Sequence, residues 1–329
     1  MEASFARRRI VEPPRLRALA QRSDFWGWAQ TLSHFGAIAL TGGLLWVALG
    51  SWLAVPLFLV HGALIGFTYA AQHELSHGAV FKTKWLNEWI GRFVGFVQLY
   101  PRDFDQIQHF AHHQHTSVWI KDGELVREPY TLRTYLLWLS GVTYWWTRLT
   151  RLYRLSRGIV VEPYIRPDQH AKVIREARVH VALYVVLALG SLALQSWALL
   201  ILWIAPMFAM KWVHQLQNTI EHLGLEHSGD ILTNTRSTAT NALMRWVCWQ
   251  MQYHTAHHMF PSVPFWKLKE LNGDLEAGIG GPPHRMGYIE FQIAVIRALS
   301  GGKTEADYPM NEVWILPRPG GGEMRMPAE

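Results

Sequence analysis

Two long stretches without Asp, Glu, Lys or Arg constrain the fold of this 329-residue chain more than any other feature. The first runs from Phe25 to His73 and the second from Val179 to Met210. A helix that spans a bilayer needs roughly 20 apolar residues, so each stretch is long enough to cross a membrane. Only 17% of the residues are charged, against about 25% in soluble domains. The sequence therefore predicts an all-α integral membrane protein.

Each charge-free stretch is expected to form a helical hairpin. Gly50-Ser51 predicts a turn in the first, and the segment from Ser191 to Trp197 predicts one in the second. This gives about four transmembrane helices in two hairpins. We expect a basic, mobile cytoplasmic arm over residues 1–24, a membrane catalytic domain over residues 25–299 and a C-terminal tail over residues 300–329.

The placement of the basic residues predicts the orientation. The two expected turns carry no charge, whereas the arm, the segment 82–178 and the chain from Lys211 onwards carry all the Lys and Arg. Lys and Arg are enriched on the cytoplasmic side of membrane proteins, so both termini are expected in the cytoplasm, together with a helical cap that carries all four histidine groups. Trp89–Tyr100 and Tyr135–Trp146 are apolar but too short to span, and we expect helices there at the interface or under the cytoplasmic cap. Membrane topology thus accounts for the placement of the basic residues behind the net charge of +6, and we expect no nucleic-acid partner.

The histidines gather in four groups whose spacing indicates metal binding. The groups are His73-Glu74-Leu75-Ser76-His77, His109-Phe110-Ala111-His112-His113, Asn218-Thr219-Ile220-Glu221-His222 and His254-Thr255-Ala256-His257-His258. Residues three and four apart share a helix face. In the two HxxHH groups we expect positions i and i+3 on one face with i+4 beside them, so that one helix serves two neighbouring metals. Packing alone does not call for such spacings, and burying unpartnered imidazoles is costly.

Nine histidines exceed the needs of one ion, so the sequence predicts two. Neutral imidazole suits Zn, Cu, Fe and Ni, but a catalytic zinc site uses about three protein ligands. Two redox ions in a nitrogen-rich shell fit oxygen activation on a lipid. A non-enzymatic membrane protein that stores or senses metal is the alternative from another class. We expect the isolated histidines to be hydrogen-bonded structural groups: His34, His61, His170, His180, His214, His227 and His284.

The boxes HELSH, HFAHH and HTAHH, in this order and separated by apolar hairpins, resemble the membrane fatty acid desaturase superfamily over roughly residues 30–270. The resemblance implies a di-iron centre, with His222 as a further ligand between boxes two and three, and Asn218 as a ligand through water. The region from Gln252 to Phe265 and the tripeptide Asn234-Thr235-Arg236 are similar to small bacterial desaturases. The implied histidine ligands are His73, His77, His109, His112, His113, His222, His254, His257 and His258.

Carboxylates near the boxes are candidates for outer-shell partners, because a metal-bound imidazole commonly donates its other N–H to one. We expect this role for Glu74 and Glu221, and leave it open for Asp105 and Asp122. His115 is expected to be a neighbour of box two rather than a tenth ligand. For Arg236, orienting a ligand and forming a surface ion pair both remain open.

The resemblance implies an O2-dependent di-iron lipid desaturase that inserts a double bond into a fatty acyl chain. A hydroxylase, a ketolase or a terminal-alkene-forming fatty acid decarboxylase on the same scaffold is the alternative, since the segments Asn218–Gly224 and His73–Gly78 are similar to membrane alkane hydroxylases. Against this, their second box has the longer HxxxHH spacing. The single cysteine, Cys248, excludes an internal Cys-ligated iron–sulfur cluster and is expected to pack as a small apolar residue. We therefore expect an external ferredoxin-type electron donor with its reductase. The apolar hairpins and the resemblance to small bacterial desaturases lead us to expect that the protein lies in the bacterial inner membrane.

Overall fold

A computed structural model describes residues 10–118, 121–125, 127–225, 230–279 and 286–304. Helices form most of this part of the chain, as predicted. In the described ranges, strands occur only at Thr238–Ala239 (β1) and Met286–Gly287 (β2), which pair in parallel. His227, His284 and the tail beyond residue 304 lie outside the described residues.

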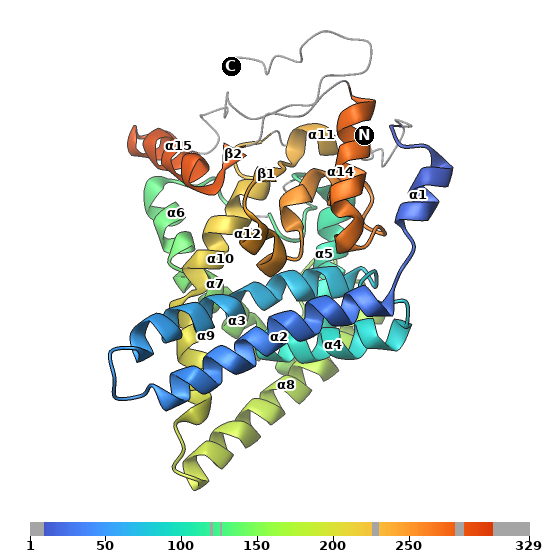
Figure 1. Cartoon of the computed structure of the whole chain (residues 1–329). Coiled ribbons are helices and arrows are strands. Elements are labelled where there is room, and N and C mark those ends of the chain that lie inside the picture. Colours follow the sequence, from blue (N-terminus) through green and yellow to red (C-terminus); the bar gives the residue numbers. More distant parts are fainter. Residues whose placement is uncertain (1–9, 119–120, 126, 226–229, 280–285, 305–329) are drawn as a thin grey trace.

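The first charge-free stretch forms the expected hairpin of α2 (Asp24–Val47) and α3 (Ala54–Ser76), which lie side by side (Figure 1). The turn between them contains Gly50 at φ +85°, a left-handed conformation that glycine adopts at little cost. At the other end of α2, Asp24 accepts hydrogen bonds from the backbone N–H (2.9 Å) and hydroxyl (2.7 Å) of Thr83. This end of the hairpin is thereby fixed to the segment that follows α3.

The second stretch also turns where expected, after α8 (Pro167–Ala193), but its returning limb is divided. The limb consists of a π-helical turn η1 (Leu200–Ile204), α9 (Ala205–Ala209) and α10 (Lys211–Asn218). Pro206 has no N–H for the helix ladder, and the carbonyl of Leu202 four residues earlier accepts instead from His61 Nε2 at 2.7 Å. His61 therefore has the structural role predicted for it.

The other isolated histidines in the described ranges are hydrogen-bonded as well. His34 bonds the carbonyl of Leu64 and the indole N–H of Trp249, both at 3.0 Å. Hydrogen-bond partners of the remaining three are the carbonyl of Ile165 for His170, the hydroxyl of Tyr184 for His180 and the amine of Lys211 for His214.

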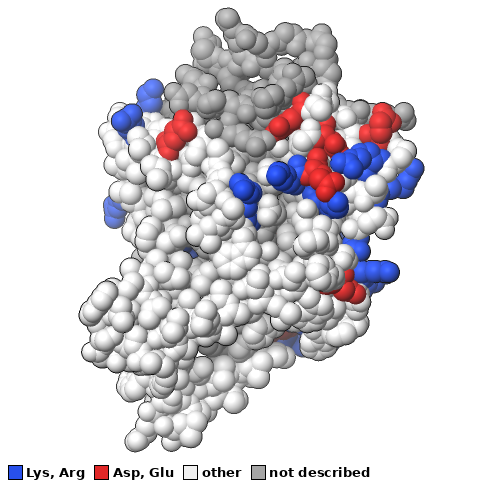
Figure 2. Space-filling view, in the orientation of Figure 1, with Lys and Arg blue, Asp and Glu red and all other residues white. Residues whose placement is uncertain are grey.

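Among the described residues, two helices, α3 and α8, are long and apolar enough to cross a membrane by length and composition. Each belongs to a different hairpin, so one helix of each predicted pair meets this criterion. Figure 2 shows that charged side chains gather over the upper and right-hand parts of the molecule, whereas the lower left part, which holds the hairpin turns, has none on this face. On the face shown, the uncharged region with the hairpin turns is thus distinct from the charged upper part, here termed the cap.

Shorter helices lie beside the apolar part, where the sequence predicted interfacial helices. α4 (Lys84–Val97) exposes Trp85, Trp89 and Phe93. The second predicted helix is instead two, α6 (Leu132–Leu139) and α7 (Val142–Ser156), because Gly141 between them has a φ of +80°. Trp146 of α7 is 71% exposed, so this helix also presents an apolar face outwards.

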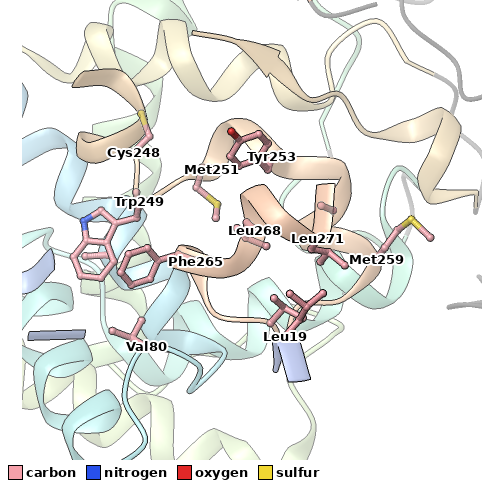
Figure 3. Close-up of a cluster of buried hydrophobic side chains, with 14 of the residues drawn as sticks. Leu19, Val80, Cys248, Trp249, Met251, Tyr253, Met259, Phe265, Leu268 and Leu271 are labelled. Carbon is pink, nitrogen blue, oxygen red and sulfur yellow. The ribbon is translucent and has the colours of Figure 1, made fainter. Parts of the chain in front are cut away.

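The cap contains the remaining elements and rests on an apolar core (Figure 3). Leu19, Trp249, Phe265 and Leu268 belong to this core, as does the buried Cys248, which packs as predicted. The elements are α1 (Pro13–Leu19), α5 (Arg102–His115), η2 (Thr219–Glu221), α11 (Ile231–Asn234), α12 (Ala242–Val247), η3 (Met251–Tyr253), α13 (His254–Met259), η4 (Phe265–Lys267), α14 (Leu268–Gly278) and α15 (Tyr288–Ser300).

The described part of the N-terminal arm differs from the mobile segment that was expected. α1 packs on α14, where Arg15 Nε lies 2.7 Å from a carboxylate oxygen of Asp274, and Leu19 is buried in the core. The alternation of basic and apolar residues in α1 explains this: the leucine face is buried while the arginines stay at the surface.

Candidate metal centre

Nine histidines from four segments meet at the boundary between the hairpins and the cap. They come from the end of α3, from α5, from the residue after η2 and from α13. In each of two groups, every histidine offers a ring nitrogen within 4.8 Å of the others. One group is His73, His77, His109, His113 and His257, and the other is His112, His222, His254 and His258. These are the nine that the sequence singled out, and His115 lies in neither group.

The spacing of the ring nitrogens fits a metal ion in each group. In the group of five, Nε2 of His109 lies 2.7 Å from Nε2 of His77 and 3.0 Å from Nε2 of His113. In the group of four, the Nε2 atoms of His222 and His254 are 2.8 Å apart. Two ligands at right angles on one ion, each about 2.1 Å from it, are themselves about 3.0 Å apart. The Nε2 atoms thus converge as ligands of a common ion do.

The division into groups differs from the expected one in a detail. His109 and His113, at positions i and i+4, share a group, while His112 belongs to the other. In α13, His254 and His258 likewise stay together and His257 crosses over. The reason is helix geometry: at 3.6 residues per turn, i+4 lies about 40° from i, whereas i+3 lies about 60° away on the opposite side. Each HxxHH helix therefore gives a pair to one group and a single ligand to the other.

Carboxylates lie within hydrogen-bonding distance of Nδ1 in two histidines of α5. Asp122, fully buried, lies with both oxygens 3.0 Å from Nδ1 of His112. Glu124 Oε1 lies 2.8 Å from Nδ1 of His109. The sequence analysis left the outer-shell role of Asp122 open and did not name Glu124. The signal that could have indicated Glu124 is the pair of acidic residues, Asp122 and Glu124, that follows box two. Asp105 accepts from the hydroxyl of Ser76 at 3.1 Å, and no hydrogen bond to a histidine is seen for it in the described part of the chain.

Glu74 and Glu221, expected as outer-shell groups, lie near imidazoles without a hydrogen bond to their Nδ1 atoms among the described residues. Glu74 Oε1 is 3.3 Å from Nδ1 of His257 and 3.5 Å from Nδ1 of His73. Glu221 Oε1 is farther from its imidazole, 3.8 Å from Nδ1 of His254. Glu221 also accepts from the side-chain amide of Asn218 at 2.9 Å. Burial raises the pKa of Glu221 to about 8, so this carboxyl is protonated at neutral pH before a metal binds.

The tripeptide Asn234-Thr235-Arg236 fixes the segment that carries His222. The carbonyl of Asn234 accepts from Nδ1 of His222 at 3.0 Å. Arg236 is 1% exposed, and its guanidinium donates to the carbonyls of Ile220 and Leu223, the latter at 3.1 Å. Arg236 is therefore not a surface residue: it positions the backbone on both sides of His222.

Burial keeps most of these imidazoles neutral, which is the form that binds metals. Burial lowers the pKa of His222 to about 3, and it lowers the pKa of His113 and His258 well below the ordinary value. His112 is the exception: burial lowers its pKa, but the charges of Asp122 and Glu124 outweigh this and raise it to about 9. A metal at the group of four would displace that proton.

A cavity of about 420 Å³ opens onto the centre. Its lining includes His73 from the group of five, His112, His222 and His254 from the group of four, and Asn218. A substrate in this cavity would touch both groups. Asn218 thus lines the same cavity as three histidines of the group of four.

The described part of the protein is mostly helical, with two apolar hairpins and two buried groups of histidines that could each hold a metal ion. The sequence model of the family described as fatty acid desaturase matches residues 49–291, more than half of the chain, and the protein belongs to this family of enzymes.

Similar proteins include the sn-1 oleoyl-lipid 12-desaturase of Synechocystis sp., with 22% identity over 77% of this chain and 76% of the relative. The sn-1 acyl-lipid omega-3 desaturase (ferredoxin) of the same organism has 26% identity over 70% of each chain. The chloroplastic omega-6 fatty acid desaturase of Spinacia oleracea has 20% identity over 78% of this chain and 61% of the relative.

Proposed function

We propose that the protein is an O2-dependent di-iron lipid desaturase that inserts a double bond into a fatty acyl chain. The observation that carries the proposal is the pair of buried histidine groups of five and four ligands, which open onto one cavity. The acyl-lipid desaturases among its relatives support the reaction and the substrate class.

The two histidine groups would each hold one iron ion, and Asn218 would complete the smaller group through a water molecule. Two iron ions bound there would supply the oxidising power for C–H cleavage with O2. The reaction converts a –CH2–CH2– unit, O2, two electrons and two protons into –CH=CH– and two water molecules. The electrons come from a ferredoxin-type donor and its reductase; the name of one relative includes ferredoxin for that enzyme.

The residues of the chain have three tasks in this reaction. The histidines hold the metal ions, and Asp122 and Glu124 fix the ring orientation of two of them through Nδ1. Glu74 and Glu221 serve the same purpose from α3 and η2. The cavity holds the substrate against the centre, since effective catalysis needs the reacting carbons within a few ångströms of the oxidant.

The proposed topology has four spans, with both termini and the cap in the cytoplasm of a bacterial inner membrane. The arm 1–24, the catalytic domain 25–299 and the tail 300–329 are its parts. The uncharged hairpin turns and the charged cap in Figure 2 support this orientation. Labelling of single introduced cysteines in intact cells tests it: a cysteine at Ser51 should react with an impermeant reagent, and one at exposed Lys269 should not.

The test of function is product analysis in a bacterial host that also expresses a ferredoxin and its reductase. Wild-type protein should bind two iron ions per chain and give a new unsaturated acyl chain. His257→Ala should lose iron and product. His115→Ala is the matched control, because His115 lies outside both groups, and should keep both. Hydroxylated lipid or a volatile alkene would assign the related oxidations instead, and a purified protein without iron would overturn the proposal.

A further inference from the structure

One arginine is buried beside the metal centre without a carboxylate partner. Arg148 of α7 is 8% exposed and lines the same cavity as His73 and His112. Within the described residues, no acceptor is within hydrogen-bonding distance of its Nε or Nη1. Burial of an unpaired cation is costly, so this position calls for an explanation.

Aromatic rings pack against the Arg148 guanidinium. Its Cζ lies 3.3 Å from the ring centroid of Tyr100 and 4.1 Å from that of Tyr144. Such cation–π contacts hold the planar group in place and leave the N–H groups of Nε and Nη1 without an acceptor in the described part of the chain. A planar guanidinium fixed in this way is prepared for a two-pronged contact with an oxyanion.

Other side chains of the cavity wall add unused donors. The hydroxyls of Thr143 and Tyr144 and the indole N–H of Trp138 are buried, and none has a hydrogen-bond partner in the described part of the chain. All three residues lie on or next to α6 and α7. The wall therefore combines a cation with several neutral donors, which is the chemistry of an anion site.

Among the described residues, no carboxylate of the cavity wall lies within ion-pair distance of Arg148. Glu124 is bonded to His109 at 2.8 Å, and Glu128 lies at the exposed rim. The nearby Lys211 amine lies 3.7 Å from the ring centroid of Tyr144 and 2.9 Å from Nδ1 of His214. Arg148 therefore supplies the positive charge on this side of the cavity.

We propose that Arg148 binds an anionic oxygen group of the substrate, a carboxylate or a phosphate, inside the cavity that reaches the metal centre. The inference rests on the proposed function, because it places the substrate in that site. It makes Arg148 the residue that selects acid-bearing substrates over neutral ones. The cavity volume of about 420 Å³ is toward the lower end of the range for small-molecule sites, which fits a fatty acid or a similarly compact acid.

The test is ligand binding by the purified, iron-loaded protein, followed through its tryptophan fluorescence or by calorimetry. The probes are dodecanoate, dodecyl phosphate and neutral dodecanol. Arg148→Gln should weaken dodecanoate or dodecyl phosphate binding roughly 10- to 100-fold, as expected for loss of charge-assisted hydrogen bonds, and should leave dodecanol binding unchanged. The tighter of the two anions tells whether the site takes a carboxylate or a phosphate. Arg157→Gln is the control, because Arg157 is exposed at the end of the same helix.

Equal binding of dodecanoate by wild type and Arg148→Gln would overturn the inference and leave a purely structural clamp between tyrosines. If Arg148→Gln does not fold or loses iron, the affinities of the wild-type protein for the three probes decide. Similar wild-type affinities for dodecanoate, dodecyl phosphate and dodecanol would also overturn the inference. The proposed function is judged separately. Binding of the acid that depends on Arg148, without any oxidation product from the wild type, refutes the desaturase and keeps the anion site.

Discussion

The Asp122 carboxylate contacts both the imidazole of His112 and the backbone of its own loop, so its replacement by Asn has several measurable effects. The buried carboxylate contacts Nδ1 of His112 with both oxygens, and accepts backbone N–H groups from Ser117 (2.8 Å), Glu124 (2.8 Å) and Leu125 (3.0 Å). Asn keeps one oxygen and replaces the other by an NH2 group that cannot accept. The backbone donors then decide which orientation the amide takes.

The contacts give the size of the effect. If the NH2 group replaces Oδ2, only the N–H of Ser117 loses its acceptor, at a cost of about 1–3 kcal/mol. If it replaces Oδ1, Glu124 and Leu125 both lose theirs, at about twice that cost. The first orientation is preferred and His112 keeps one oxygen contact. Loss of the carboxylate behind a ligand typically lowers metal affinity about 10- to 100-fold.

The assay is a competition for iron between the purified protein and a chelator, combined with thermal unfolding in detergent. Asp122→Asn should release one of two iron ions at lower chelator concentration and unfold at lower temperature. Glu88→Gln is the control, because the Glu88 carboxylate is half exposed on α4. Iron release from Asp122→Asn that matches wild type within twofold would refute the reasoning.

Two further predictions concern packing and pH. In Gly62→Ala the new Cβ would lie 2.8 Å from the carbonyl carbon of Pro206 and push α3 away from α9, which should lower the free energy of unfolding by about 1–3 kcal/mol. The control is Gly43→Ala, whose Cβ meets nothing within 4 Å, and which should be neutral or slightly stabilising. Equal melting temperatures for the two variants would contradict this. In the iron-free folded protein the pKa of His112 is raised to about 9 and that of Glu221 to about 8. Protonation of these two groups therefore stabilises the folded state. The His112 contribution is complete below the unfolded pKa of about 6.5 and is lost as pH rises through about 9, at up to about 1.4 kcal/mol per pH unit for each group. The melting temperature of iron-free protein should therefore fall between pH 7 and 9.5, and a rise over this interval would refute the assignment.

The sequence by itself determined the hairpins and the nine histidines, because both signals are local. A run without charges has few alternatives to a membrane, and the spacing of His73 and His77 or of His254 and His258 brings imidazoles together once a helix forms. The turn at Gly50 is local in the same sense, since it needs one residue with positive φ.

Only the tertiary structure decided which histidines lie in the same group, because that depends on how α3, α5 and α13 are rotated against one another. It alone brought Glu124 to His109 and turned Arg236 inward to the backbone around His222. It also placed Arg148, far from any box in the sequence, in the cavity of the metal centre. These relations join residues from separate elements, and no periodicity within one element encodes the packing that brings them together.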